Sequence, residues 1–183
     1  MSEPLQKPGR SKQDYGTPPA FLEAVKAKLG IWDFDCDLAA SDENTVTHVG
    51  YFTEEGDALQ EDSWKFRDGW NWLNPPYRNI GAWVSKAHYE WFVRDARTAV
   101  LIPAAVGSNW WRDHVHNKAG VFFLNPRITF VGCKDPYPKD CALLLYGDNP
   151  GYDVWTWKPS RSVNAVAAPV DGPPSAQFAQ EEF

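Results

Sequence analysis

The stretch from Trp70 to Tyr77, which reads WNWLNPPY, constrains this chain more than any other. Apolar residues lead into Asn74. Pro75 and Pro76 then stop any strand or helix, because proline has no backbone N–H. A residue before proline favours extended geometry, so we expect Asn74 to end a strand and Tyr77 to follow on a rigid turn. The stretch therefore predicts a side-chain amide, backbone carbonyls and an aromatic ring at one place.

Such a place suits a planar ring that carries an exocyclic amino group. The Asn74 side-chain oxygen and the Pro75 carbonyl can each accept one N–H, while Tyr77 stacks on the ring. The same residues also fit a strand that ends in a Pro-Pro turn with a structural tyrosine, because short motifs recur by chance. Both interpretations stay open on this stretch alone.

The spacing of apolar residues predicts helices that alternate with strands. Thr17 is expected to cap the first helix, with Pro18 at its first position, and Gly30 to end it. Further helices are predicted at 80–94 and 108–116. Strands are predicted at 32–38, 70–74, 98–103, 121–124, 128–131, 141–146 and 152–157.

This order indicates a three-layer α/β fold with a mostly parallel sheet and a C-terminal antiparallel hairpin made by 128–131 and 141–146. The expected domain spans 14–158, while the compositions of 1–13 and 159–183 predict disordered tails. Ligands of such sheets bind at the carboxyl ends of the strands. Two of those ends carry unusual residues, the Asp37–Ser41 run (DLAAS) and Asn74–Tyr77. If their strands are neighbours, the two sites lie side by side, as a group transfer requires.

The net charge of −6 is unevenly distributed over the 183 residues. Residues 1–70 carry a net −7, residues 71–147 a net +4, and the remainder −3. This division suits a cationic small molecule on one side and a polyanion on the other. No apolar run reaches membrane-spanning length, and the N-terminus does not read as a signal peptide. Cys36, Cys133 and Cys141 indicate reduced thiols in a cytoplasm, and no metal site is predicted, because His114 and His116 lack further ligands at metal-binding spacing.

Several short motifs, taken in order, resemble the phage-type DNA N6-adenine methyltransferases, a small Dam-like family that uses S-adenosylmethionine. The resemblance covers roughly residues 13–147. The motifs are Thr17-Pro18-Pro19, Asp37–Ser41 with Asn44, Tyr51-Phe52-Thr53, Asp57-Ala58-Leu59, Trp72–Tyr77, Leu101-Ile102-Pro103, Ser108 with Trp110-Trp111, Arg127–Phe130 and Cys141–Leu144.

The resemblance implies a Rossmann-like class I methyltransferase fold and methyl transfer to the exocyclic N6 of a flipped-out adenine in DNA. It implies double-stranded DNA as partner, no metal, a monomer or weak dimer, and, for a phage-encoded protein, the cytoplasm of the bacterial host. Protection against host restriction is the biological role the family suggests. The implied catalytic residues are Asn74, Pro75, Pro76 and Tyr77. The implied cofactor contacts are Thr17, Pro18, Asp37, Ala39, Asn44 and Asp57, with Glu54 or Glu55 at the ribose. The implied DNA contacts are Arg78, Asn79, Arg112 and Arg127, with the 133–140 loop.

Two departures from the family pattern leave alternatives open. The Ala39-Ala40-Ser41 run replaces the usual glycine-rich cofactor loop, and Asn74 replaces the acid that begins the motif in most amino-methyltransferases. Cytosine-N4 or RNA amino-methylation needs the same pair of acceptors. A non-catalytic nucleic-acid-binding protein with a degenerate methyltransferase fold is the alternative from another class.

Overall fold

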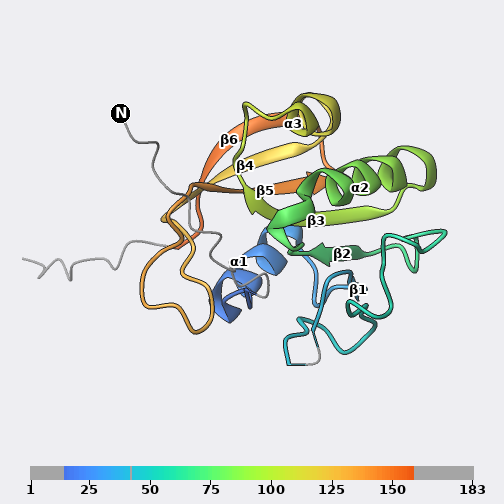
Figure 1. The fold of residues 1–183 in the computed structure, drawn as a ribbon, viewed down its shortest axis with the longest axis horizontal. Coiled ribbons are helices and arrows are strands. Elements are labelled where there is room, and N and C mark those ends of the chain that lie inside the picture. Colours follow the sequence, from blue (N-terminus) through green and yellow to red (C-terminus); the bar gives the residue numbers. More distant parts are fainter. Residues whose placement is uncertain (1–14, 42, 159–183) are drawn as a thin grey trace, which may run out of the picture.

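A six-stranded sheet forms the centre of the protein (Figure 1). The computed structural model describes residues 15–41 and 43–158, so the predicted disordered tails, 1–13 and 159–183, lie outside the described residues. The strands are β1 (Cys36–Asp37), β2 (Trp70–Leu73), β3 (Arg97–Pro103), β4 (Gly120–Asn125), β5 (Cys141–Tyr146) and β6 (Gly151–Thr156). The helices are α1 (Pro19–Leu29), α2 (Ile80–Arg94) and α3 (Asn109–His114), and Tyr77–Asn79 form the short 3₁₀ turn η1.

The sheet is mixed, so the prediction of a mostly parallel sheet was wrong. Its strand order is β1-β2-β3-β5-β4-β6. The pairs β1–β2, β2–β3 and β4–β6 are parallel, whereas β5 is antiparallel to both of its neighbours, β3 and β4. The chain leaves the carboxyl end of β4 and enters β5 at that same end of the sheet. β5 therefore runs antiparallel to β4.

The antiparallel hairpin exists, but one of its predicted strands is wrong. Its partners are β4 and β5, and residues 128–131 form no strand. Ile128 and Phe130 instead bury their side chains against the α1 face of the sheet. The backbone of this segment bonds to loops, since Val131 N–H donates to Gly16 O and Tyr137 N–H donates to Ile128 O. The predicted edge strand at the C-terminal end is confirmed as β6.

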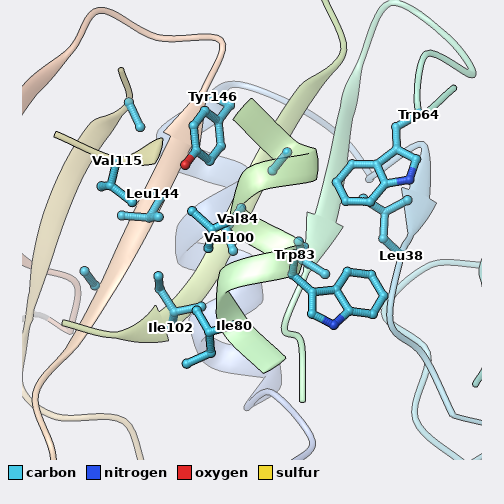
Figure 2. Close-up of a cluster of buried hydrophobic side chains, with 14 of the residues drawn as sticks. Leu38, Trp64, Ile80, Trp83, Val84, Val100, Ile102, Val115, Leu144 and Tyr146 are labelled. Atoms are coloured by element: carbon cyan, nitrogen blue, oxygen red, sulfur yellow. The ribbon is translucent and has the colours of Figure 1, made fainter. Parts of the chain in front are cut away.

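Helices cover both faces of the sheet, which confirms the three layers (Figure 1). Alternate strand residues point to opposite faces. Val100, Ile102 and Leu144 therefore pack under α2 and α3 (Figure 2), whereas Ala99, Leu101 and Leu143 pack against α1. Because α2 starts just beyond the carboxyl end of β2, this packing fixes where the Asn74–Tyr77 turn lies.

Two predicted boundaries moved because polar side chains found tertiary partners. Helix α1 begins at Pro19 with Pro18 in the capping position and no side-chain cap, so the prediction of Thr17 as the cap was wrong. The predicted strand at 32–38 shrinks to β1, because Asp33 and Asp35 accept bonds from the backbone N–H groups of Phe34 and Gly69.

The irregular segment between β1 and β2 is anchored by Trp64, which is fully buried and lies beside Trp83 of α2 (Figure 2). Its backbone N–H donates to the Glu90 carboxylate (2.9 Å), and Glu90 is itself fully buried. Lys86 and Arg94 lie 3.1 and 2.9 Å from the same carboxylate. This ion cluster joins α2 to the loop that precedes β2.

Candidate active site

The carboxyl ends of β1 and β2 lie side by side, as the sequence analysis required for a transfer site. The two strands are parallel neighbours, with Asp37 opposite Trp72. The N–H of Leu38 continues the pairing by donating to Trp72 O at 3.0 Å. The Asp37–Ser41 loop and the Asn74–Tyr77 turn therefore leave the sheet next to each other.

The Asn74 side chain is held in one orientation by the segment that precedes α1. Its amide Nδ2 donates to the carbonyl oxygen of Tyr15 at 2.6 Å and to the hydroxyl oxygen of Thr17 at 3.3 Å. Both bonds use the NH2 side of the amide. The oxygen, Oδ1, is thereby directed away from these acceptors and is the atom left to accept a hydrogen bond from a ligand.

Tyr77 belongs to a cluster of four aromatic rings, which we call the aromatic cluster: Tyr15, Tyr77, Phe130 and Tyr137. The Tyr15 and Phe130 rings stack with centroids 5.0 Å apart, and Tyr137 meets Tyr77 edge-on at 5.7 Å. The Tyr77 hydroxyl is buried and has no hydrogen-bond partner within the described part of the chain. Burial holds the pKa of Tyr77 well above its usual value, so the ring is neutral and apolar in character.

Asp37 is a buried carboxylate at the end of β1, with 3% of its surface exposed. Its oxygens accept from the backbone N–H groups of Ala39 (3.3 Å) and Val46 (3.0 Å). Burial raises the pKa of Asp37 to about 6, against the opposing effect of these two bonds. A buried acid whose charge is only partly offset by its surroundings is suited to a cationic ligand.

Four other residues implied as cofactor contacts, Thr17, Pro18, Ala39 and Asn44, lie in or beside the loop that follows Asp37. Ala39 and Asn44 belong to the same loop, where Ser41 and Asn44 pair through both backbone bonds. Thr17 and Pro18 reach this loop through Gly16, since a Cβ added to Gly16 would lie 3.0 Å from Asn44 Oδ1. A side chain at position 16 would therefore require the Asn44 and Val131 side chains to shift by a few tenths of an ångström.

Asp57 lies on the far side of this loop, in the turn after Phe52. Phe52 is hydrogen-bonded to the loop after β1, because its carbonyl oxygen accepts from the Ala40 N–H at 2.8 Å. Asp57 has a φ of +33° and accepts from Leu59 N–H at 3.2 Å, which is a structural use of the carboxylate. Phe52 connects this segment to Asp37, because its backbone N–H donates to the Asp37 carbonyl oxygen at 2.8 Å.

The charge of this region fits a cationic cofactor with hydroxyl groups. Residues 31–64 include Asp33, Asp37, Glu54, Glu55 and Asp57 and contain no lysine or arginine. Carboxylates accept hydrogen bonds from hydroxyls and balance a positive charge. The acidic side chains of this region are therefore compatible with the sulfonium and ribose of S-adenosylmethionine.

The residues implied as DNA contacts are all exposed, but two of the arginines are already engaged in ion pairs within the protein. Arg78 and Asn79 lie in η1, directly after Tyr77. Arg112 forms a two-bond pair with Asp113 (2.6 and 2.8 Å), and Arg127 pairs with Asp140 at 2.7 Å. Arg127 and the 133–140 loop belong to the long excursion between β4 and β5, seen as the orange loop beside the N-terminal half of α1 (Figure 1).

Sequence reasoning missed three members of the aromatic cluster. The sequence assigns no role to Tyr15, includes Tyr137 only within the 133–140 loop implied to contact DNA, and includes Phe130 only within a motif of the resemblance. The available signal was weak, because these residues are distant in sequence and only the fold brings them to Tyr77.

The described residues hold no group of three or more His, Cys, Asp or Glu side chains that could bind a metal ion. Within the same ranges, no helix has the length and apolarity needed to cross a membrane. Cys36, Cys133 and Cys141 are all free thiols, and burial raises the pKa of Cys36 and Cys141 to about 12.

Comparison with known proteins identifies the family of the chain. Residues 6–142 match the family described as DNA N-6-adenine-methyltransferase (Dam). A relative from Escherichia phage T1, named DNA N-6-adenine-methyltransferase, is 27% identical over 115 residues, which cover 63% of this chain and 46% of that protein. The chain thus spans about half the length of this curated relative, and no solved structure matches it. The family match covers most of the described residues, and the chain belongs to the DNA N-6-adenine-methyltransferase (Dam) family.

Proposed function

We propose that this protein transfers a methyl group from S-adenosylmethionine to the exocyclic N6 of an adenine in double-stranded DNA. The observation that carries the proposal is the fixed orientation of the Asn74 amide, which directs Oδ1 away from the two acceptors that hold its NH2 group. Family membership supports the same activity.

The adenine amino nitrogen is a poor nucleophile because its lone pair is delocalised into the ring. Hydrogen bonds from this amino group to Asn74 Oδ1 and to the Pro75 carbonyl place electron density on nitrogen and fix its direction. No strong base is required, because the proton can leave after the methyl group has been transferred. The chemistry is positioning plus electrostatics, for which effective molarity supplies on the order of 7–11 kcal/mol.

A base inside a duplex cannot reach this site, so the adenine has to be flipped out at a cost of about a few kcal/mol. Stacking of the base on an aromatic ring offsets about 1–3 kcal/mol of that cost. Tyr77 follows Pro76 on a rigid turn and has an apolar, neutral ring. We therefore assign the stacking surface to Tyr77, with Pro75 and Pro76 setting the turn.

S-adenosylmethionine supplies the electrophilic methyl group when it is bound. We assign Asp37 and the backbone of Ala39 to its methionine end, with Asn44 at the same loop. Thr17 and Pro18 are proposed to close over this end through backbone and methyl atoms, because the Thr17 hydroxyl is already used by Asn74.

We propose Asp57 as the contact to the cofactor adenine and Glu54 or Glu55 as the contact to the ribose. These contacts extend the proposed cofactor site from the loop after β1 toward Phe52. We also propose that residues 14–158 form a single domain with a Rossmann-like class I methyltransferase fold.

Arg78, Asn79, Arg112 and Arg127 are the proposed DNA contacts, with the 133–140 loop. The first two follow Tyr77 directly, and Arg127 leads into the loop that carries Tyr137 of the aromatic cluster. We further propose that the protein acts in the cytoplasm of a bacterial host as a monomer or weak dimer.

The test is incubation of the purified protein with unmethylated duplex DNA and labelled S-adenosylmethionine, followed by digestion and mass spectrometry of the nucleosides. N6-methyl-2′-deoxyadenosine in the digest is the expected result. N4-methylcytosine, or methylation of RNA alone, would correct the substrate. Absence of any methylated nucleoside together with absence of cofactor binding by calorimetry would favour a non-catalytic nucleic-acid-binding protein.

A further inference from the structure

Thr17 provides one of the two acceptors that hold the Asn74 amide. Thr17 is buried, with 8% of its surface exposed, although it belongs to a segment outside the sheet. Its hydroxyl does not cap α1 and lies 3.3 Å from Asn74 Nδ2. Tyr15 provides the second acceptor at 2.6 Å through its backbone carbonyl.

We propose that Thr17 is a positioning residue for methyl transfer, which holds the Asn74 amide with Oδ1 toward the bound base. This inference rests on the proposed function, because it assigns to Asn74 the role of accepting a hydrogen bond from the base amino group. It assigns the Thr17 hydroxyl to Asn74, whereas the backbone and methyl group of Thr17 remain the proposed contacts to the cofactor.

An asparagine side chain needs such an anchor because its two ends are chemically opposite. Rotation of the amide by 180° would present NH2 donors to the amino group of the base, which is itself a donor. The same rotation would place Oδ1 against the Tyr15 carbonyl, which can only accept, although the Thr17 hydroxyl could then donate to Oδ1. The Tyr15 carbonyl therefore selects the orientation of the amide, and the Thr17 hydroxyl is a second acceptor that holds the selected orientation in place.

The segment that provides these acceptors is itself held by the neighbouring loops. The Gly16 carbonyl accepts from Val131 N–H at 2.9 Å, and a Cβ at Gly16 would lie 3.2 Å from the Val131 side chain. The positions of Tyr15 O and Thr17 Oγ1 are thus set by the loop that follows β4 as well as by β2.

The anchor also accounts for the asparagine at position 74. A carboxylate there would place a charged oxygen near the Tyr15 carbonyl, which can accept but cannot donate. Only a protonated acid could donate to Tyr15 O while presenting its other oxygen to the base. An amide satisfies this site at any pH, whereas an aspartate satisfies it only when protonated.

The first experiment compares Thr17→Val with Thr17→Ser. Valine keeps the shape and the methyl group but removes the acceptor, whereas serine keeps the hydroxyl. We expect Thr17→Val to lower kcat by about five- to fiftyfold, with the S-adenosylmethionine Kd within about twofold of wild type by calorimetry. Thr17→Ser should restore most of kcat. A weaker cofactor Kd with unchanged kcat in Thr17→Val would overturn the inference and make Thr17 a cofactor contact.

The second experiment does not depend on methylation and uses Asn74→Asp. Repulsion by the Tyr15 carbonyl raises the pKa of an acid at this position above its unfolded value, so the folded state binds the proton more tightly. Stability relative to wild type then falls as pH rises through the unfolded pKa toward the folded one. We expect the melting-temperature deficit of Asn74→Asp to grow by about 3 °C or more between pH 4 and pH 8.

Wild type is the control for the other titratable groups near position 74, namely Asp37, Tyr15, Tyr77, Tyr137 and Arg78, because both proteins carry all of them. A deficit that stays constant or shrinks with pH would contradict the anchor. If wild type methylates nothing, the proposed function fails, but this stability curve still decides the inference.

Discussion

The side-chain amide nitrogen of Asn74 lies 2.6 Å from the backbone carbonyl oxygen of Tyr15, which is 59 residues earlier in the chain. The bond connects the residue that follows β2 to the segment before α1. The candidate catalytic amide is therefore oriented by tertiary structure rather than by its own strand. The Asn74–Tyr77 turn provides the amide, and the 15–17 segment fixes which end of that amide is left to accept a hydrogen bond.

Tyr77 should be needed for its ring rather than for its hydroxyl. Tyr77→Ala removes the stacking surface, and we expect it to lower kcat/KM by about 5- to 150-fold, which corresponds to the roughly 1–3 kcal/mol of base stacking. Tyr77→Phe is the matched variant, because the hydroxyl has no partner in the described structure. Its melting temperature should equal or exceed that of wild type. A large loss of stability in Tyr77→Phe would show that the hydroxyl is hydrogen-bonded.

Cofactor affinity should depend on the ionisation of Asp37. Burial raises the pKa of this group to about 6, and a sulfonium favours the ionised form. The Kd for S-adenosylmethionine should therefore be about tenfold weaker at pH 5 than at pH 7, where the carboxylate is charged. In Asp37→Asn the Kd should be weaker and nearly independent of pH. Calorimetry at pH 5, 6 and 7 measures this, and a flat wild-type profile would remove Asp37 from the cofactor site.

The same group should affect stability without cofactor. Its folded pKa lies above the unfolded value of 3.8, so the folded state holds the proton more tightly. Wild type should lose about 3 kcal/mol from this group as pH rises from about 4 to 6. Urea unfolding of wild type and Asp37→Asn across this range checks the sign. A wild type that gains stability relative to Asp37→Asn as pH rises would contradict it.

Glu90 should be a major contributor to stability although it lies outside the proposed site. It is fully buried and is bonded to Trp64 N–H, Lys86 and Arg94. Glu90→Ala leaves the N–H and two cations without this acceptor and should cost about 2–4 kcal/mol. The matched control is Glu23→Ala, whose side chain is 73% exposed in its pair with Lys26, and which should cost less than about 0.5 kcal/mol. Equal losses in urea unfolding would contradict the importance of the cluster.

DNA binding should depend on the exposed lysines of the 126–140 loop more than on its arginine. Arg127 is paired with Asp140 at 2.7 Å, which reduces its net charge toward DNA, and Lys134 and Lys139 are exposed. Replacing both lysines with alanine should weaken duplex binding and reduce the slope of log K against log salt by about 2.

Lys118→Ala is the matched control for that measurement, because Lys118 precedes β4 and so lies at the opposite end of the sheet from the 126–140 loop. Its salt slope should stay at the wild-type value. A slope that falls as much in Lys118→Ala as in the double variant would mean that DNA does not follow the 126–140 loop.

Much of the fold followed from local chemistry. The pattern of α2 and the continuous apolar run of β3 were readable because periodicity and burial agree there. β2 ends at Leu73, one residue before the predicted end at Asn74, and two prolines follow as the prediction required. Where the prediction failed, side chains competed with the backbone. Asp33 and Asp35 shortened β1, and the hydroxyl of Thr17 went to Asn74 rather than to the helix end.

The remaining errors concern pairings that are set over long distances. Residues 128–131 have the composition of a strand, but Ile128 and Phe130 gain more by packing against the α1 face. The aromatic cluster could not be read from the sequence because its members come from three separated segments. The motifs indicated that Asp37 and Asn74 lie at the carboxyl ends of two strands, which are neighbours in the sheet. The orientation of the Asn74 amide depends instead on its contact with Tyr15, which no motif contains.

The most direct test of the account is methylation by wild type and by Asn74→Ala on the same unmethylated duplex DNA. Nucleoside mass spectrometry reads out the product, and calorimetry reads out S-adenosylmethionine binding in parallel. The account predicts N6-methyl-2′-deoxyadenosine with wild type, a loss of at least about 100-fold in Asn74→Ala, and a cofactor Kd that changes little. Methylation that persists in Asn74→Ala would contradict the central claim that the oriented amide of Asn74 receives the adenine amino group.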